Sequence, residues 1–398
     1  LATLAEATAP PMKTIKVGTG DKEYTLGGET VLYRHDKTFV SRTRYAISLC
    51  SCMDDADIDA KLEAMKKVDY ERIGEQMYVE MVYVNYHEGD AQDKYLDIVK
   101  KAAATGRVLV LGCTDEAVAK AALDICKDGK PILNGANAAN AEAMSKLATD
   151  AGVVLGVSGA DLNELYDTVA KLEGLGNKNL VLDTTGADVK TTFANTVQVR
   201  RAAIKNEDRT FGYPSIVNLS KIAKDDKYMQ EALVSLFTMK YGSIVVLDQM
   251  SYDVALPLYG LRQNVFTDPQ KPMTVEPGIY PINGGDENSL CLTTVDFALT
   301  YFVVSGELER SGVPCNLLIS DAAGMSVLTA WAAGKLSSGT IAKFVQENVE
   351  DKIKCRKLVI PGKVAVLKGD LEAKLPGWEI IVAPDEAVQL VKFMKEFK

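Results

Sequence analysis

The stretch VLVLGCTDEAVAKAALDICKDGKPILNGANAANAEAMSKLATDAGVVLGV, residues 108–157, indicates the fold of most of the chain. Apolar runs and amphipathic stretches alternate in it: Val108–Gly112, Asp115–Lys127, Pro131–Asn134, Ala139–Ala151 and Val153–Val157. Apolar runs of this length are typical of buried strands, and the longer stretches between them are typical of helices. Strands that alternate with helices pair in parallel, because a parallel connection needs a crossover of helix length.

The same alternation continues on both sides of this stretch. Further strands are predicted at Tyr45–Cys52, Met77–Val84, Leu180–Asp183, Ser215–Leu219 and Ser243–Asp248, and further helices at Ala91–Ala104 and Leu162–Leu172. About eight strand–helix units in roughly 200 residues predict one (β/α)8 barrel of the TIM type, over residues 27–263. An open, doubly wound sheet is the alternative that the alternation allows.

A second, smaller unit is predicted after a connection rich in Pro, Gly and Asp at residues 264–290. The predicted elements are a helix at Thr294–Leu308, a strand at Cys315–Ser320, a helix at Ser326–Gly334, short strands at Lys357–Ile360, Val364–Leu367 and Glu379–Ala383, and a helix at Asp385–Phe397. This order predicts a small doubly wound α/β domain over residues 291–398.

The first 26 residues are predicted to be a linker. Their start, LATLAEATAPPMK, is rich in Ala, reaches a Pro pair and has no basic region of the kind that opens a signal peptide. A frayed terminus is the alternative to a linker that follows another domain. This segment and the connection at residues 264–290 are the two predicted hinges.

Composition excludes some classes of partner. The chain has a formal net charge of -9, and an acidic chain repels a phosphate backbone, so nucleic acid is not an expected partner. We find no apolar run of the roughly 20 residues that a membrane span needs.

The seven Cys are odd in number and widely spaced, which predicts reduced thiols in a cytoplasm and neither a four-Cys cluster site nor a zinc site.

Polar residues follow several predicted strands, at the barrel face where active sites form. Examples are the clusters Asn134/Asn137/Asn140 and Asp183/Thr184/Thr185. Capping of the next helix is the alternative role for each of them. The two His, His35 and His87, are expected to be surface or packing residues, and none of the motifs GxSxG, HExxH, GxxxxGK(S/T) and GxGxxG is present.

The second unit contains a turn rich in small residues, within SDAAGMSVLTAWAAGK at residues 320–335. Small residues after a strand let a ligand approach the backbone, and the N–H groups of Met325, Ser326 and Val327 are predicted to be free at the start of the next helix. Thr293 and Thr294 are predicted at the start of an earlier helix. Simple connection and capping are the alternatives. Val327, Leu328, Trp331 and Ala332 are predicted to place one helix face in the core.

Two segments carry a specific resemblance. TTVDFALTYFVVSGELERSGVPCNLLISDAAGMSVLTAWAAGK, residues 293–335, resembles the signature region of the large (gamma) subunit of corrinoid iron–sulfur proteins, which is similar to the corresponding subunit of archaeal acetyl-CoA decarbonylase/synthase. GGETVLYRHDKTF, residues 27–39, resembles the same family where its chain enters the barrel. The resemblance covers nearly the whole chain, in order.

The resemblance implies a corrinoid of the cobalamin type, held between the C-terminal domain and a small partner subunit in a heterodimer. Carried over to matching positions, the residues facing this cofactor are Thr293, Thr294, Asp321, Ala322, Ala323, Gly324, Met325, Ser326 and Thr329, with Ala383 and Pro384 as weaker candidates from topology. The family begins with a Cys-rich domain that binds a 4Fe–4S cluster, and this chain starts in the linker after it, so no cluster is expected here.

The resemblance also implies a function. A separate methyltransferase would present methyltetrahydrofolate, cob(I)amide would take its methyl group, and acetyl-CoA synthase would receive it in the reductive acetyl-CoA pathway. The second unit contains no His, so cobalt would receive no imidazole from it, which eases reduction to Co(I). A protein without a corrinoid would lack that His equally. A barrel methyltransferase that binds a pterin and a scaffold subunit without a cofactor are the two alternatives.

Overall fold

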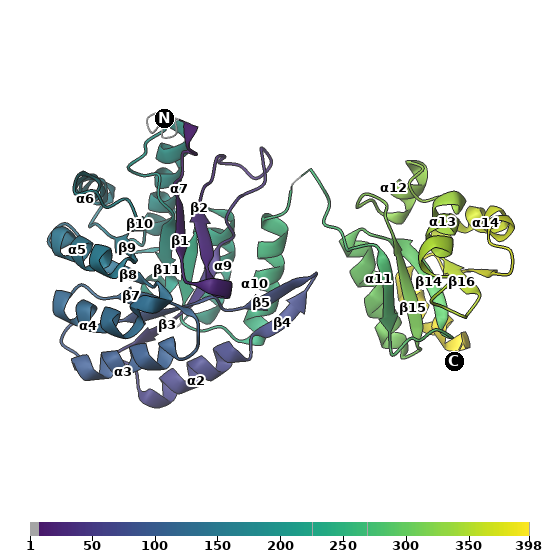
Figure 1. Ribbon diagram of the computed structural model, residues 1–398, viewed down its shortest axis with the longest axis horizontal. Coiled ribbons are helices and arrows are strands. Elements are labelled where there is room, and N and C mark those ends of the chain that lie inside the picture. Colours follow the sequence, from purple (N-terminus) through teal and green to yellow (C-terminus); the bar gives the residue numbers. More distant parts are fainter. Residues whose placement is uncertain (1–7, 225, 269, 398) are drawn as a thin grey trace. The chain divides into compact units, whose positions relative to one another are not determined.

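The computed structural model describes residues 8–224, 226–268 and 270–397 and divides into two compact units, one ending at Phe266 and the other beginning at Thr267 (Figure 1). The first residues of the predicted linker, 1–7, lie outside the described residues. The two units are described separately.

The first unit is a closed barrel of eight parallel strands in the order β10-β11-β12-β3-β6-β7-β8-β9. Its strands are β3 (Arg44–Cys50), β6 (Met81–Asn85), β7 (Val108–Gly112), β8 (Ile132–Ala136), β9 (Val154–Val157), β10 (Leu180–Asp183), β11 (Ser215–Asn218) and β12 (Ile244–Leu247). Most of their residues are buried, because the barrel interior lies on one side and helices lie on the other. The predicted barrel is confirmed, and the open-sheet alternative is wrong for this unit.

Helices follow the barrel strands along the chain, as Figure 1 shows. They are α2 (Asp55–Lys66), α3 (Gln92–Ala103), α4 (Glu116–Cys126), α5 (Ala141–Ala151), α6 (Leu162–Gly174), α7 (Val189–Lys205), α8 (Leu219–Ile222), α9 (Lys227–Met239) and α10 (Tyr252–Val265). Asp115 and Asp161 cap α4 and α6, because each carboxylate accepts from two N–H groups at the start of its helix.

The predicted strand at Met77–Val84 is two strands. β5 (Glu75–Tyr78) pairs with β4 (Asp69–Arg72) in an antiparallel hairpin, and β6 enters the barrel. Glu80 lies between them and explains the break. Its carboxylate turns inward, where it pairs with Arg262 of α10 at 2.5 Å and accepts a hydrogen bond from the Tyr45 N–H.

Arg262 and Glu80 form a buried ion pair at the amino end of the barrel. Arg262 is 4% exposed and also donates to the Thr43 carbonyl oxygen at 2.9 Å. Its guanidinium lies against the rings of Tyr45 and Tyr259, with centroids at 5.1 and 4.5 Å. The pair therefore attaches α10, the last helix of this unit, to the two first strands of the barrel.

Residues 14–26 are not a linker, so the prediction from their composition and position is wrong. They form most of an antiparallel hairpin of β1 (Thr14–Val17) and β2 (Tyr24–Gly27), whose residues Val17 and Leu26 are fully buried. The Gly18 N–H donates to the carbonyl oxygen of Lys130, just before β8, so the hairpin covers the amino end of the barrel. The alternation of TIKV, with Ile15 and Val17 inward, is the strand signal that the prediction passed over.

The second unit contains a five-stranded sheet in the order β13-β15-β14-β16-β17. The strands are β13 (Gly278–Ile282), β14 (Leu290–Val295), β15 (Cys315–Ser320), β16 (Lys357–Ile360) and β17 (Glu379–Val382), and all but β13 are parallel. One face packs against α12 (Val327–Ala332), α13 (Ser338–Asn348) and α14 (Lys368–Lys374), and the other against α11 (Ala298–Ser311) and α15 (Leu390–Met394). The predicted doubly wound domain is therefore confirmed.

The predicted connection at residues 264–290 is wrong at both of its ends. Residues 264 and 265 end α10, and residues 278–282 form β13 at the sheet edge. Pro281 suggested a break, but an edge strand tolerates proline because one side of its backbone needs no ladder partner. Residues 272–275 also belong to the second unit, where the Val275 N–H donates to the Asp296 carbonyl oxygen and the Ala298 N–H to that of Met273.

Four smaller predictions in this unit are also wrong. Thr293 and Thr294 lie in β14 rather than at a helix start, as suits β-branched residues. Residues 364–367 belong to the 3-10 helix η3 (Gly362–Leu367), and the last helix breaks into η4 (Ala387–Gln389), α15 and η5 (Lys395–Phe397). On α12, Leu328 and Trp331 are exposed rather than in the core.

The prediction of reduced thiols is wrong for Cys50 and Cys52, which form a disulfide at the end of β3. The chain turns there, and the Cys52 N–H points back to the Cys50 sulfur at 3.3 Å. Among the free Cys, Cys355 is half-buried, while Cys113, Cys126, Cys291 and Cys315 are buried.

Alkylation of the native protein with iodoacetamide at pH 8 is expected to label Cys355 and to leave Cys126 and Cys291 unmodified. Burial raises the pKa of each of these two thiols to about 12, so about one in ten thousand is a thiolate at pH 8. Peptide mass spectrometry measures the labels. Treatment with a reductant should add labels at Cys50 and Cys52, and labelling of native Cys291 would contradict the described core.

Candidate functional site

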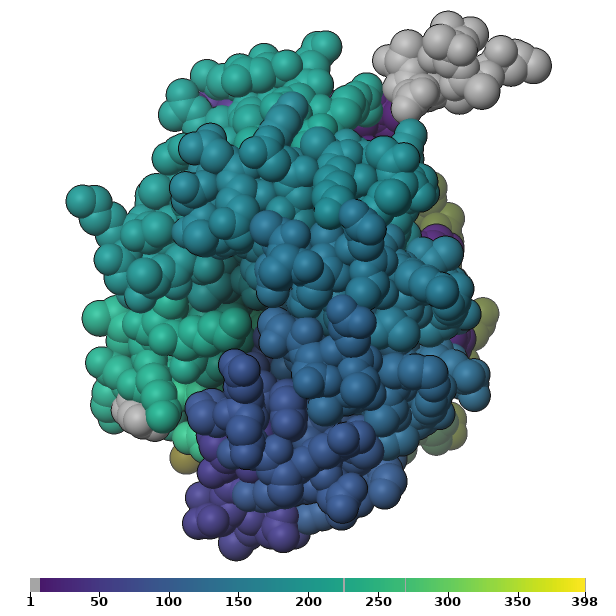
Figure 2. Space-filling model, turned by 90° about the vertical axis from the view of Figure 1, so that its left-hand side faces the viewer, coloured from purple at the N-terminus to yellow at the C-terminus, as the bar shows by residue number. Residues whose placement is uncertain are grey.

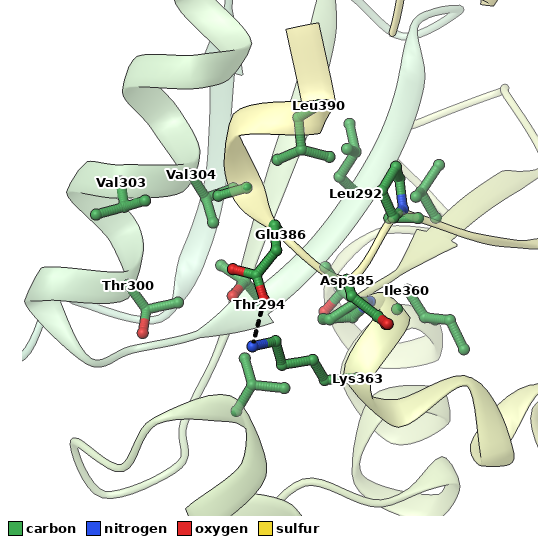
Figure 3. A pocket seen from close by; sticks show the side chains of 18 of the residues that line it. Leu292, Thr294, Thr300, Val303, Val304, Ile360, Lys363, Asp385, Glu386 and Leu390 are labelled. Atoms are coloured by element: carbon green, nitrogen blue, oxygen red, sulfur yellow. Dashed lines mark ion pairs between the residues drawn. The ribbon is translucent and has the colours of Figure 1, made fainter. Parts of the chain in front are cut away.

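A pocket of about 360 Å³ opens at the carboxyl edge of the sheet in the second unit (Figure 3). The chain passes from β14 to β15 on one side and then to β16 on the other, so the strand order reverses between β14 and β16. Open α/β sheets bind ligands outside their strands at such a switch point. The wall is mostly apolar, and Leu292, Val304, Ile360 and Leu390 contribute to it.

Two threonines with buried hydroxyl groups belong to the wall of this pocket, and as successive residues of β14 they point to opposite faces of the sheet. Thr293 is 4% exposed and Thr294 is 2% exposed, and neither Oγ1 atom has a hydrogen-bond partner within the described residues. A buried hydroxyl without a partner costs roughly 1–3 kcal/mol. Two of them at the end of one strand fit a site that a polar ligand completes.

An ion pair crosses the mouth of the pocket. The Lys363 Nζ lies 3.0 Å from the Glu386 Oε1, and Figure 3 shows the lysine reaching from the loop after β16 to the loop after β17. These loops approach closely at Gly362, where a Cβ atom would lie 2.4 Å from the Ala383 carbonyl oxygen. Asp385 stands beside the pair at the same mouth.

The turn after β15 is held by a buried carboxylate. Asp296, 4% exposed, accepts from the Ala322 N–H at 3.0 Å and from the Gly324 N–H at 3.1 Å. Ala323 and Gly324 have positive φ values of 54° and 70°, and a Cβ on Gly324 would lie 2.9 Å from a side-chain atom of Thr274. The turn is thus fixed by β14 and by the chain that enters the unit.

Of the N–H groups of Met325, Ser326 and Val327, which are predicted to be free for a ligand, at least one already donates a hydrogen bond within the turn. The Met325 N–H donates to the Ala322 carbonyl oxygen at 3.2 Å, so the prediction that it is free is wrong. The Ser326 hydroxyl lies 3.0 Å from that of Thr329.

The structure brings part of the predicted site together. The residues of that set that line the pocket are Thr293, Thr294, Ser326, Ala383 and Pro384. Those that belong to the turn or to α12 without lining the pocket are Asp321, Ala322, Ala323, Gly324, Met325 and Thr329. Sequence reasoning missed Lys363, Glu386 and Asp296, although the position of Lys363 just after a predicted strand was a usable signal.

Exposed apolar side chains lie around the pocket, and we call them the apolar rim: Leu299 and Val303 of α11 and Leu328 of α12, which line it, and Phe302 and Trp331. Their exposed fractions reach 62% at Leu299. Contiguous exposed apolar surface of this kind marks a site for a ligand or a partner protein.

The carboxyl end of the barrel has a larger recess, of about 730 Å³, and Figure 2 shows a hollow where green and blue parts of the chain meet. On the barrel floor, the Asn134 amide donates to Asp183 at 2.9 Å and to the Tyr83 hydroxyl at 3.2 Å. Tyr83 and Asp183 raise the pKa of Lys221, which stays charged at neutral pH. Side chains of both signs line the recess, so it favours no single class of ligand.

The polar clusters after β8 and β10 are largely used within the barrel. Asn140 donates to the carbonyl oxygens of Thr114 and Gly135, and its Oδ1 accepts from the Asn137 N–H. The Thr184 hydroxyl bonds that of Thr196, and the Thr185 hydroxyl accepts from the Asn218 N–H. Both histidines, His35 and His87, are exposed.

No group of three or more His, Cys, Asp or Glu side chains among the described residues is arranged to hold a metal ion. None of the helices within those residues combines the length and apolarity that a membrane crossing requires.

The chain is similar to known proteins over nearly its whole length. Residues 14–394 match the family model described as the CO dehydrogenase/acetyl-CoA synthase delta subunit. The chain is 38% identical to the corrinoid/iron–sulfur protein large subunit of Moorella thermoacetica, over 98% of this chain and 87% of that protein. It is 33% identical to the acetyl-CoA decarbonylase/synthase complex subunit gamma of Methanopyrus kandleri, over 99% and 87%.

The chain is also similar to solved structures. Dihydropteroate synthase from Thermus thermophilus is 17% identical and has a TM-score of 0.40, with 55% of this chain and 92% of that chain covered.

Proposed function

Because this chain belongs to the family of corrinoid/iron–sulfur protein large subunits and acetyl-CoA decarbonylase/synthase gamma subunits, we propose that it is a corrinoid-dependent methyl carrier. Its second unit holds the corrinoid together with a small partner subunit. A separate methyltransferase supplies the methyl group from methyltetrahydrofolate, and acetyl-CoA synthase receives it.

The observation that carries this proposal is the apolar pocket with the unpartnered hydroxyls of Thr293 and Thr294. A corrinoid with a nucleotide side chain would use this site in two parts, with the nucleotide inside the pocket and the ring outside it. The planar base and ribose suit a pocket of about 360 Å³ whose wall is apolar but offers two hydroxyls. The much larger corrin ring stays outside, against the apolar rim and the turn at residues 321–326.

When bound, the corrinoid supplies a cobalt that takes up and releases a methyl group. The residues of this chain do the rest. Thr293 and Thr294 would hold the base, the apolar wall and rim would exclude water, and Asp296 fixes the turn at residues 321–326, which would face the corrinoid. The second unit would contribute no imidazole to the metal of a bound corrinoid, because both His of the chain precede it.

The direct test is anaerobic reconstitution of the chain with its small partner subunit and a corrinoid, followed by cobalt analysis and visible spectroscopy. We expect stoichiometric cobalt and the spectrum of a bound corrinoid. A colourless complex with trace cobalt would overturn the proposal and favour a scaffold subunit.

The double substitution Thr293→Val/Thr294→Val is expected to weaken corrinoid binding about ten- to a hundredfold, since two hydrogen bonds of about 0.5–1.5 kcal/mol each are lost. Spectroscopic titration measures the affinity. The apo protein should be as stable as before or more stable, because the change removes buried hydroxyls that have no partner.

Thr196→Val is the matched control. Its hydroxyl donates to the Thr192 carbonyl oxygen and bonds Thr184 inside the barrel, so this change should cost stability and leave corrinoid affinity unchanged. Equal affinity of the double variant and the unchanged protein would remove the two threonines from the site.

A further inference from the structure

We propose that Lys363 selects corrinoids that carry a nucleotide side chain, by leaving Glu386 and pairing with the phosphate of that side chain. This inference rests on the proposed function and names a residue that determines which corrinoid the pocket accepts. It starts from the ion pair at the pocket mouth in Figure 3.

Lys363 is the basic side chain of the pocket wall, as far as the described residues extend, and it stands where a ligand must enter. Two acidic residues, Asp385 and Glu386, share the mouth with it. The interior beyond them is apolar apart from the threonine hydroxyls. A base that enters this interior brings the phosphodiester of its nucleotide link to the mouth, within reach of the lysine.

The existing partner of Lys363 is easily exchanged. The Lys363 side chain is 41% exposed and that of Glu386 is 65% exposed. Exposed pairs of this kind contribute about 0–1 kcal/mol, because water and salt screen them. A phosphate delivered by a bulky ligand excludes water around the pair, and hydrogen bonds between charged groups gain from that.

The backbone fixes the start of the lysine side chain. Gly362 packs against the loop after β17, where a Cβ atom would meet Ala383, Pro384 and Asp385 within 2.8 Å. On the other side, Val364 is fully buried. Lys363 therefore leaves a rigid platform, and only its flexible side chain has to move from Glu386 to a phosphate.

The two acidic neighbours determine in which direction each substitution should change the affinity for a nucleotide-bearing corrinoid. Without Lys363, the mouth keeps Asp385 and Glu386 and repels a phosphate. Without the Glu386 charge, Lys363 has no partner to leave and repulsion falls. Lys363→Met and Glu386→Gln should thus change the affinity for a nucleotide-bearing corrinoid in opposite directions.

The test compares cobalamin with cobinamide, which has the same ring and no nucleotide, in spectroscopic titrations of the complex with the small subunit. For each variant the ratio of the two dissociation constants is taken, so differences between the free ligands cancel. Lys363→Met is expected to weaken cobalamin binding about tenfold and to leave cobinamide binding within twofold. Glu386→Gln is expected to strengthen cobalamin binding, and Lys363→Arg to preserve it.

Lys368→Met is the matched control, because Lys368 forms a similarly exposed pair with Glu372 at 3.7 Å and does not line the pocket. It should change neither affinity. Equal losses for both corrinoids in Lys363→Met, or no loss for either, would overturn the inference. If the unchanged complex binds neither corrinoid, the proposed function itself fails, and that result differs from both of these.

Discussion

Replacing Arg262 with methionine is expected to lower the free energy of unfolding of the barrel by about 3–5 kcal/mol. The change leaves the carboxylate of Glu80 buried without the guanidinium 2.5 Å away. Arg44, at 3.6 Å, is more distant and does not replace it. The two tyrosine rings beside Arg262 also lose their cation.

Denaturant unfolding of the full chain can assign this loss of stability to the barrel rather than to the second unit. Both Trp residues, Trp331 and Trp378, lie in the second unit, so their fluorescence reports that unit and far-UV circular dichroism reports the barrel as well. Arg262→Met should move the dichroism transition and leave the fluorescence transition in place. The double change Glu80→Gln/Arg262→Met should recover part of the loss, because no buried charge then remains unpaired.

Lys101→Met, in the same unit, is the control for this experiment. The Lys101 side chain is 40% exposed and that of its partner Asp59 is 60% exposed, so the loss of this pair should leave the dichroism transition nearly in place. If the Arg262→Met barrel proved as stable as the unchanged one, the buried pair would contribute nothing net.

Replacing Asp296 with alanine is expected to destabilise the second unit by about 2–6 kcal/mol and to weaken corrinoid binding. The N–H groups of Ala322 and Gly324 lose their buried acceptor, at about 1–3 kcal/mol each. Here the tryptophan fluorescence transition should move and the barrel transition should stay.

Asp321→Ala tests whether any carboxylate in the turn has this effect. Asp321 is exposed and accepts only from the Ala323 N–H at 3.0 Å among the described residues. We expect a loss of under about 1 kcal/mol, because water can satisfy the released N–H. Similar losses for the two substitutions would contradict the special role of the buried Asp296.

The barrel could be predicted because its strands carry a strong local signal. A parallel strand buried on both sides is apolar at nearly every position, as in Val108–Gly112, and its boundaries follow from the composition alone. The hairpin at residues 14–27 has a weaker signal, since only Ile15 and Val17 alternate in β1 and the contacts that stabilise it lie far away in the sequence.

The pocket could be predicted only in part, for a related reason. Thr293, Thr294, Ala383 and Pro384 follow from resemblance or from their place near strand ends. The pair of Lys363 and Glu386 depends on two loops meeting at Gly362, and nothing near either residue specifies that approach. The role of Asp296 could not be predicted for the same reason, because the N–H groups that donate to its carboxylate lie 26 and 28 residues later in the chain.

The hydrogen bonds of Met273 and Val275, and the packing of Gly324 against Pro272, fix where the chain enters the second unit. The entry point lies beside the turn at residues 321–326. A rotation of the second unit about this entry point therefore displaces the turn least. It displaces the parts of the sheet that lie farther from the entry point more. In lever terms, the edge of the unit that carries this turn lies at the fulcrum.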